Sequence, residues 1–202
     1  RILIVAEHAG GKLNAAVAKC VSCAASMPDP EITIAVLAAG GAAVAQAAAG
    51  LAGVTRVVLV DHPANEPALA AVLAPQVARL AEGHSHVFGP STTFGKDLMP
   101  RVAALLDAAQ VSDVMSVESS RCFRRLVYAG NAIVTVEATG SGPVVATVRV
   151  ASYQEAAAGG SARIEAVKLD VAVPTHTRFL SVTAARSDRP DLQTASRVVS
   201  GG

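Results

Sequence analysis

The chain has 202 residues and a net charge of +1, with 51% apolar residues, 3% aromatic residues and no tryptophan. Its basic residues are scattered along the sequence, which argues against nucleic acid or an anionic membrane as a partner. No apolar stretch approaches the roughly 20 residues that a membrane-spanning helix needs, so we expect no membrane insertion. A core built from Ala, Val, Leu and Ile favours a parallel sheet covered by Ala-rich helices.

Short β-branched or aliphatic runs alternate with longer Ala- and Leu-rich stretches in the first half of the chain. The short runs predict strands at residues 2–6, 32–37, 56–60 and 86–88. The longer stretches predict helices at residues 14–27, from Gly40-Gly41 through residue 51, at 66–82 and at 95–109, the first capped by Asn14 and the last with Pro100 in its first turn. Strands separated by helices of this length imply right-handed crossovers and a mostly parallel sheet.

The rhythm changes after residue 113, where the strand candidates leave little room for helices between them. Glycine-containing turn signals separate these candidates, and we predict that they form antiparallel hairpins. They lie at residues 114–118, 124–128, 132–136 and 144–150, and one further strand is predicted at 164–171. The expected fold class is α/β, a three-layer α/β/α arrangement of a mostly parallel sheet with added antiparallel strands.

The last part of the chain changes composition again. Residues 187–192 are polar and contain a proline, which is typical of a linker. The apolar pair Val198-Val199 then precedes Ser200-Gly201-Gly202, and a strand that runs into Ser-Gly-Gly is usually followed by a glycine-rich turn and a helix. We therefore expect one domain at residues 1–185, and at 186–202 a linker and the first strand of a further domain.

Cys20 and Cys23 form a C-x-x-C motif within the first predicted helix. Redox-active pairs of this kind stand at a helix N-terminus, where the helix dipole lowers the pKa of a thiol. This pair falls in the middle of the helix, so we predict two buried or half-buried thiols rather than a redox centre.

Few other residues point to chemistry. His8, beside Glu7, follows the first predicted strand, and parallel sheets bind ligands outside the carboxyl ends of their strands. A structural histidine that bonds to a nearby loop explains His8 equally well. Gly10-Gly11 favours an anion only weakly, and His84 and His86 match no metal-ligand spacing.

The most unusual segment is the loop at residues 89–101, which is dense in hydroxyl groups, glycine and basic residues. Its position between a strand and a helix favours a ligand or partner loop at the carboxyl edge of the sheet. The alternative is a capped helix start, with Ser91, Thr92 or Thr93 accepting hydrogen bonds from free N–H groups. Both interpretations remain open on the residues alone.

Five ordered motifs, this loop among them, resemble the alpha-subunit family of electron transfer flavoproteins. They are Leu3-Ile4-Val5-Ala6-Glu7-His8 with Gly11-Lys12-Leu13-Asn14, the stretch at 94–104, Ser112-Asp113-Val114, Tyr128-Ala129-Gly130-Asn131-Ala132, and 187–192 with 198–202. The motifs extend along the whole chain.

The resemblance implies an adenine-nucleotide alpha-hydrolase-like fold and a heterodimer of alpha and beta subunits that carries one FAD and one AMP. In that family the carboxy-terminal domain of alpha holds FAD and beta holds AMP. This chain would then be a scaffold and interface domain with no catalytic residue, no metal and no flavin site of its own, the FAD site being expected after Gly202. The expected interface residues are Phe94, Gly95, Lys96, Arg101, Tyr128 and Asn131.

The same resemblance implies an electron carrier rather than an enzyme. It would take electrons from acyl-CoA and other dehydrogenases, as in fatty acid β-oxidation, and pass them to the membrane-bound electron transfer flavoprotein–ubiquinone oxidoreductase. The implied location is the mitochondrial matrix or, alternatively, the bacterial cytoplasm.

The competing hypothesis is a stand-alone adenine-nucleotide-binding module of the universal-stress or ATP-pyrophosphatase type. Gly10-Gly11, the loop at 89–95 and the final Ser-Gly-Gly favour it, although a pyrophosphatase-type Ser-Gly-Gly normally follows the first strand of the domain. An independent enzyme finds little support, because no nucleophile–base pair can be placed.

Overall fold

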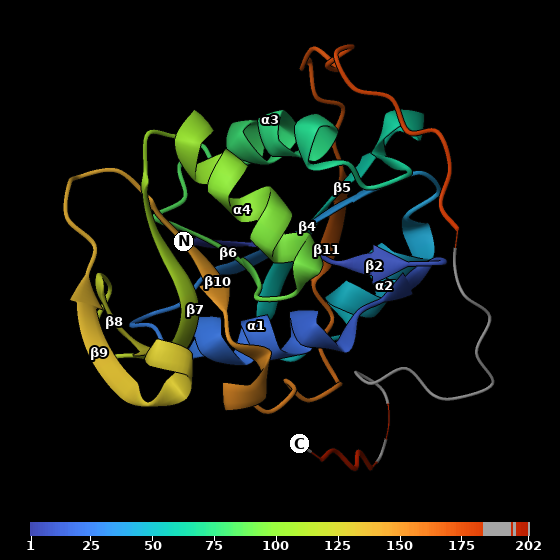
Figure 1. The fold of residues 1–202 in the computed structure, drawn as a ribbon. Helices are drawn as coiled ribbons and strands as arrows, with labels where there is room; N and C mark the ends of the chain where they lie inside the picture. Colours follow the sequence, from blue (N-terminus) through green and yellow to red (C-terminus); the bar gives the residue numbers. More distant parts are fainter. Residues whose placement is uncertain (184–194, 196, 202) are drawn as a thin grey trace.

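The computed structural model describes residues 1–183, 195 and 197–201, in which a nine-stranded sheet lies between two layers of helices (Figure 1). The strands of this sheet are β1 (Ile2–Val5), β4 (Ile32–Ala38), β5 (Val54–Asp61), β6 (His86–Pro90), β7 (Ala109–Val117), β8 (Cys122–Val127), β9 (Ala132–Glu137), β10 (Val144–Val148) and β11 (Arg163–Ala166). The helices are α1 (Ala15–Ala25), α2 (Ala42–Ala49), α3 (Ala70–Leu80) and α4 (Thr93–Leu105), with single turns η1 (Pro63–Asn65), η2 (Tyr128–Gly130) and η3 (Val150–Ser152). A separate small hairpin pairs β2 (His8–Ala9) with β3 (Lys12–Leu13).

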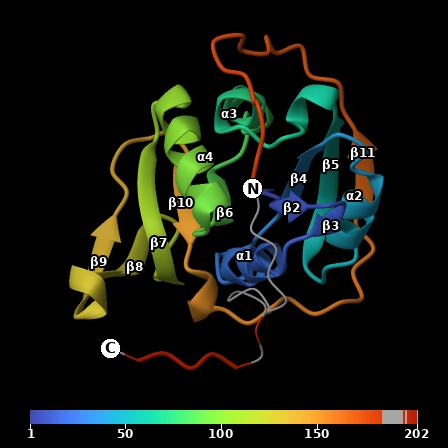
Figure 2. The ribbon, with the colours of Figure 1, turned by 45° about the vertical axis from the view of Figure 1, so that its right-hand side comes forward.

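Strand periodicity divides the core into two apolar layers. In β1, Ile2 and Ile4 point to the layer formed with α1 and α2, whereas Leu3 and Val5 point to the layer formed with α3 and α4. Both faces of the central strands are therefore buried, as in parallel sheets covered by helices. Figure 2 shows the two helical layers and the two free edges of the sheet, β11 at one side and β9 at the other.

The sheet order is β11-β5-β4-β1-β6-β10-β7-β8-β9. Every neighbouring pair from β11 to β7 is parallel, and β8 and β9 add an antiparallel hairpin. The predicted three-layer α/β/α class, with a mostly parallel sheet and added antiparallel strands, is confirmed.

The predicted pairing of residues 144–150 in antiparallel hairpins is wrong. β10 lies inside the sheet and pairs in parallel with both β6 and β7. After β9 the chain returns to the end of the sheet at which the parallel strands begin. There the Val144 N–H donates a hydrogen bond of 3.0 Å to the carbonyl oxygen of Ser85, the residue before β6. The sequence signal for this placement is the mostly apolar run Val144–Val148, which is typical of a strand covered on both faces. All five of its residues are buried in the structure.

Two helices tolerate prolines well past their first turn, contrary to the prediction for Pro100. α4 begins at Thr93 rather than residue 95, so Pro100 lies in its interior, as Pro75 does in α3. Pro100 and Lys96, whose carbonyl loses its helical partner, are both exposed residues. α4 ends at Leu105, and residue 109, predicted as helical, already belongs to β7.

Other boundaries also differ from the prediction. α3 begins at Ala70 rather than residue 66, α2 ends at Ala49 rather than residue 51, and the last strand is limited to Arg163–Ala166. Residues 167–183 and 197–201 carry no helix or strand. The predicted domain boundary near residue 185 lies outside the described residues, and the proposed division stays a prediction.

Candidate functional site

A crevice opens at the carboxyl end of the sheet, between β1 and β6. From β1 the chain passes to β4, on one side of β1 in the sheet. From β6 it passes to β7, on the opposite side, so the direction in which strands are added reverses between β1 and β6. Such a switch point is where open α/β sheets bind ligands. The crevice has a volume of about 640 Å³ and lies between the β2–β3 hairpin, the start of α1, Ser91, Thr92, Val150 and Glu155.

The two helices that start at the crevice are capped by their own side chains. Asn14 accepts a hydrogen bond from the Ala16 N–H at 2.9 Å, as predicted. Thr92 Oγ1 accepts one from the Gly95 N–H at 3.4 Å, so the hydroxyl-rich loop is at least a capped helix start. The turn into α4 is tight, because a Cβ on Gly95 would lie 1.8 Å from Pro90 O.

A carboxylate stands at the switch point. Thr92 Oγ1 donates a hydrogen bond of 2.8 Å to Glu7 Oε2, which joins the end of β1 to the start of α4. The crevice also contains Lys12, Lys19 and Glu155, so both charges are present. A negative group at a helix N-terminus interacts favourably with the helix dipole. Glu7 therefore places a negative charge beside the residue that caps α4.

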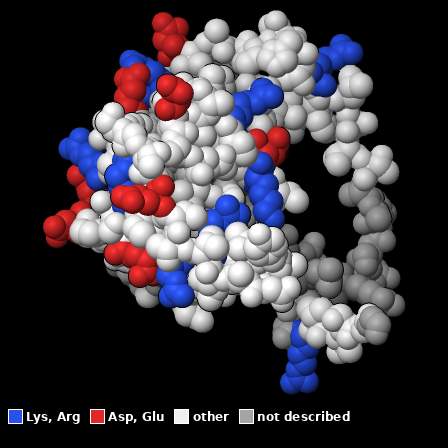
Figure 3. All heavy atoms as spheres, turned by 60° about the vertical axis from the view of Figure 1, so that its left-hand side comes forward, with Lys and Arg blue, Asp and Glu red and all other residues white. Residues whose placement is uncertain are grey.

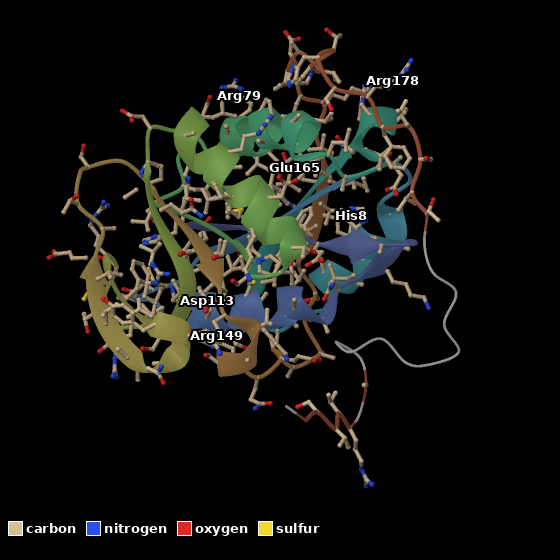
Figure 4. All side chains as sticks on the ribbon, viewed as in Figure 1. His8, Arg79, Asp113, Arg149, Glu165 and Arg178 are labelled. Carbon is tan, nitrogen blue, oxygen red and sulfur yellow. The ribbon has the colours of Figure 1, made fainter. Side chains whose placement is uncertain are left out.

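An ion pair extends the polar region across the neighbouring strands. In β7, Ser112 and Asp113 together face Thr147 of β10, a β-bulge in which Asp113 has φ of 57°. The Asp113 N–H donates to Thr147 Oγ1 at 2.8 Å, and Arg149 Nη1 donates to Asp113 Oδ2 at 2.8 Å (Figure 4). The bulge thus turns the Asp113 carboxylate toward the end of β10.

The electrostatics of this pair favour ionised Asp113. Partial burial tends to raise the pKa of Asp113, but the Ser91 hydroxyl, the Arg149 guanidinium and the positive charge of Lys96 together lower it below its ordinary value. Ser91 Oγ is buried without a hydrogen bond of good geometry in the described residues, so the bond from Arg149 is the firmer cause.

The tip of the β8–β9 hairpin lies next to this ion pair. Tyr128, Ala129 and Gly130 have φ values of 51°, 54° and 93°, so three consecutive residues adopt the left-handed region. A hollow of about 190 Å³ separates the tip from Asp113 and Arg149. Tyr128 is 81% exposed, an unusual environment for an aromatic side chain.

The sequence model of a protein family, the electron transfer flavoprotein domain, matches residues 2–174 of the chain. The chain belongs to the electron transfer flavoprotein family. It is 42% identical over 202 residues to the electron transfer flavoprotein subunit alpha of Pseudomonas aeruginosa, covering all of this chain and 64% of that protein. It is 38% identical over 202 residues to the subunit alpha of Paracoccus denitrificans, covering 64% of it. It is 36% identical over 216 residues to the mitochondrial subunit alpha of Dictyostelium discoideum, covering 99% of this chain and 60% of that protein.

The chain therefore spans less than two thirds of the length of these relatives. Both bacterial proteins and proteins named as mitochondrial are among them. The resemblance that the motifs indicated is confirmed at the level of the family.

The six residues predicted at an interface of this electron transfer flavoprotein domain fall into three groups. Phe94 is half-buried against the core layer of α3 and α4, and Gly95 is buried in the tight turn; the interface role of all six residues stays a prediction. Lys96 lies near Asp113, and exposed Arg101 lies farther along α4. Tyr128 and Asn131 are both exposed at the hairpin tip.

Sequence reasoning did not single out Glu7, Asp113 and Arg149 as a site. Each follows or interrupts a buried strand at the carboxyl edge, which is the signal that could have found them. His8 was weighed as a ligand or a structural histidine, and its Nε2–H donates to Leu37 O at 2.9 Å. That bond supports the structural role.

Cys20 and Cys23 are both buried on the inner face of α1, as predicted. Burial raises the pKa of Cys20, with smaller contributions from the negative charges of Cys23 and Glu7. Burial raises the pKa of Cys23 to about 12, and the nearby Tyr153 hydroxyl, which makes no hydrogen bond of good geometry in the described residues, offsets this only in part. Both thiols therefore stay protonated and unreactive at neutral pH.

No three His, Cys, Asp or Glu side chains among the described residues are grouped so as to hold a metal ion. None of the helices found there is both long and apolar enough to cross a bilayer. Positive and negative side chains are interspersed over the face shown in Figure 3, without a field of one sign.

Proposed function

We propose that this chain is the amino-terminal domain of the alpha subunit of electron transfer flavoprotein, acting as a scaffold and subunit interface. The whole protein would be a heterodimeric, FAD-containing electron carrier rather than an enzyme. It would take electrons from acyl-CoA and other dehydrogenases and pass them to a membrane quinone oxidoreductase. Membership of the family and the names of the alpha-subunit relatives support this proposal.

The observation that carries the scaffold role is the Glu7 carboxylate at the switch point. Phosphate groups bind there through free N–H groups at a helix N-terminus. Here Asn14 and Thr92 use such N–H groups, and Glu7 would repel a phosphate. The residues of this crevice therefore do not fit the phosphates of FAD or AMP. We expect FAD in the remainder of the alpha subunit and AMP in the beta subunit.

Purification of the 202-residue chain tests the scaffold role directly. We expect a colourless protein that gains no flavin absorbance after incubation with FAD. We also expect it to associate with the electron transfer flavoprotein beta subunit, measured by gel filtration. A stable yellow protein with nearly stoichiometric flavin would contradict the proposal.

The second candidate function is an adenine-nucleotide-binding module. Lys12 and Lys19 favour it, because both line the crevice and carry the charge that attracts phosphate. Calorimetric titration with AMP and ATP separates the two functions, since micromolar binding would favour the module. The proposed location is the mitochondrial matrix or the bacterial cytoplasm, because both bacterial proteins and proteins named as mitochondrial are among the relatives.

A further inference from the structure

The β8–β9 hairpin, residues 122–137, extends the sheet beyond both helical layers (Figure 1). The last strands with which α4 and α1 make substantial contact are β7 and β10, respectively. All residues of β8 and β9 except Phe123 are half-buried or exposed. No helix of the described chain covers this hairpin, and β9 is the last strand of the sheet.

The hydrogen bonds around the hairpin show which backbone groups of β9 face outward. The Ala138 N–H donates to Arg121 O at 2.8 Å, so the backbone of Ala138 points toward β8. Backbone direction alternates along an antiparallel strand, so alternate residues of β9 point the other way. The N–H and C=O groups of Ile133, Thr135 and Glu137 therefore form the free edge of the sheet.

The two edges of the sheet are protected differently. β11 has only four residues, and Glu165 within it contacts Arg163 at 3.2 Å and Arg56 at 3.7 Å. β9 has six residues, pairs with β8 without a bulge, and carries a single charge at its last residue, Glu137. Short length, charges, prolines and bulges normally block strand addition at an edge. β9 has almost none of these features, so its edge is suited to pairing.

The side chains of the hairpin fit a protein partner that carries acidic groups. Arg124 and Leu126 lie opposite Thr135 and Ile133 on one face, where Ile133 is 50% exposed. Within the described residues Arg124 forms no ion pair, and neither does its neighbour on the other face, Arg125.

Arginine and tyrosine are enriched at the centres of protein interfaces, and exposed Tyr128 stands at the tip of this hairpin. A second copy of the chain would bring the same two arginines rather than carboxylates. Charge complementarity therefore favours a different protein as the occupant.

We propose that β9 is a strand-addition site, at which the partner subunit adds an extended segment to the sheet. The segment bonds to the backbone groups of Ile133, Thr135 and Glu137, and its acidic side chains meet Arg124. Main-chain hydrogen bonds supply affinity in this mode of recognition, and side chains beside the strand supply specificity. The inference rests on the proposed function, which supplies the partner subunit.

The test uses the full-length alpha chain and its partner subunit, with the affinity between them measured by surface plasmon resonance. Thr135→Pro removes one outward N–H and leaves the bonds from Val134 and Val136 to β8 intact. Edge strands tolerate a proline whose missing N–H would face away from the sheet. We expect the dissociation constant to rise about ten-fold, equivalent to about 1.4 kcal/mol. Thr135→Val, the matched control, keeps the N–H and the β-branched shape, so its affinity should equal that of the wild type.

Arg124→Glu provides a second variant if Thr135→Pro fails to fold, which circular dichroism would reveal. It should also weaken binding about ten-fold, with a loss that shrinks at high salt. If the wild-type chains do not associate at all, the proposed function fails. If they associate and neither variant weakens binding, strand addition fails while the proposed function stands. Thr135→Pro abolishing a homodimer instead would make a second copy the occupant and overturn the proposal.

Discussion

Gly95→Ala provides a sharp test of the tight turn that leads from β6 into α4. In the interior of an exposed helix this substitution would stabilise a protein by about 1 kcal/mol. Here the new Cβ would lie 1.8 Å from the Pro90 carbonyl oxygen and 3.0 Å from its carbonyl carbon, both backbone atoms. Overpacking of this kind costs about 1–3 kcal/mol, and displacing the Thr92 cap adds about 1 kcal/mol. With the gain in helix propensity subtracted, we expect a net destabilisation of about 1–3 kcal/mol.

Thermal unfolding followed by circular dichroism measures this effect. For a chain of this length 1 kcal/mol corresponds to about 2–4 °C, so Tm should fall by about 2–12 °C. Gly142→Ala is the matched control, because no atom lies within 4 Å of its Cβ and its φ is outside the left-handed region. Its Tm should stay the same or rise slightly. A Tm for Gly95→Ala at or above the wild-type value would refute the close approach as the reason for glycine at this position.

Three further substitutions or labelling experiments test other features. Ala129→Gly should raise the free energy of unfolding by about 1 kcal/mol in urea titrations, because Ala129 has φ of 54°; an unchanged value would contradict strain at the hairpin tip. Arg149→Gln should lower stability at pH 7 by up to about 1 kcal/mol. Because the pKa of Asp113 is lower in the folded than in the unfolded state, this stability is fully present above the unfolded pKa of about 3.9 and is lost as pH falls through the folded pKa. The stabilities of wild type and variant should begin to approach each other below about pH 4 and become equal below the folded pKa; a difference that does not shrink as the pH falls would argue against the ion pair. Cys20 and Cys23 should resist iodoacetamide at pH 8 in the folded protein and react after unfolding, as mass spectrometry would show; rapid alkylation of the folded protein would contradict their burial.

Local signals in the sequence predicted most elements of the fold, because each depends on neighbouring residues. Asn14 before an Ala-rich stretch marked the start of α1, and its side chain caps that helix. Buried apolar runs marked the strands, and glycine-containing turns marked the β8–β9 hairpin. The position of C-x-x-C within α1 predicted two buried or half-buried thiols, and both are buried. Helix bounds near Pro100 and residue 66 were less accurate, since proline and cap positions depend on which side of a helix faces solvent.

The sequence by itself determined the fold class, the family and the burial of the core, since periodicity and motifs are local properties of the chain. Only the tertiary structure decided that β10 enters the sheet between β6 and β7, because strand order results from competition among all possible pairings. It also brought together Glu7 and Thr92, which are 85 residues apart, and Asp113 and Arg149, which are 36 apart. These contacts arise where separate strands end at one edge, so no local pattern encodes them. That β9 has a free edge likewise follows only from the complete strand order of the sheet, in which β9 stands last.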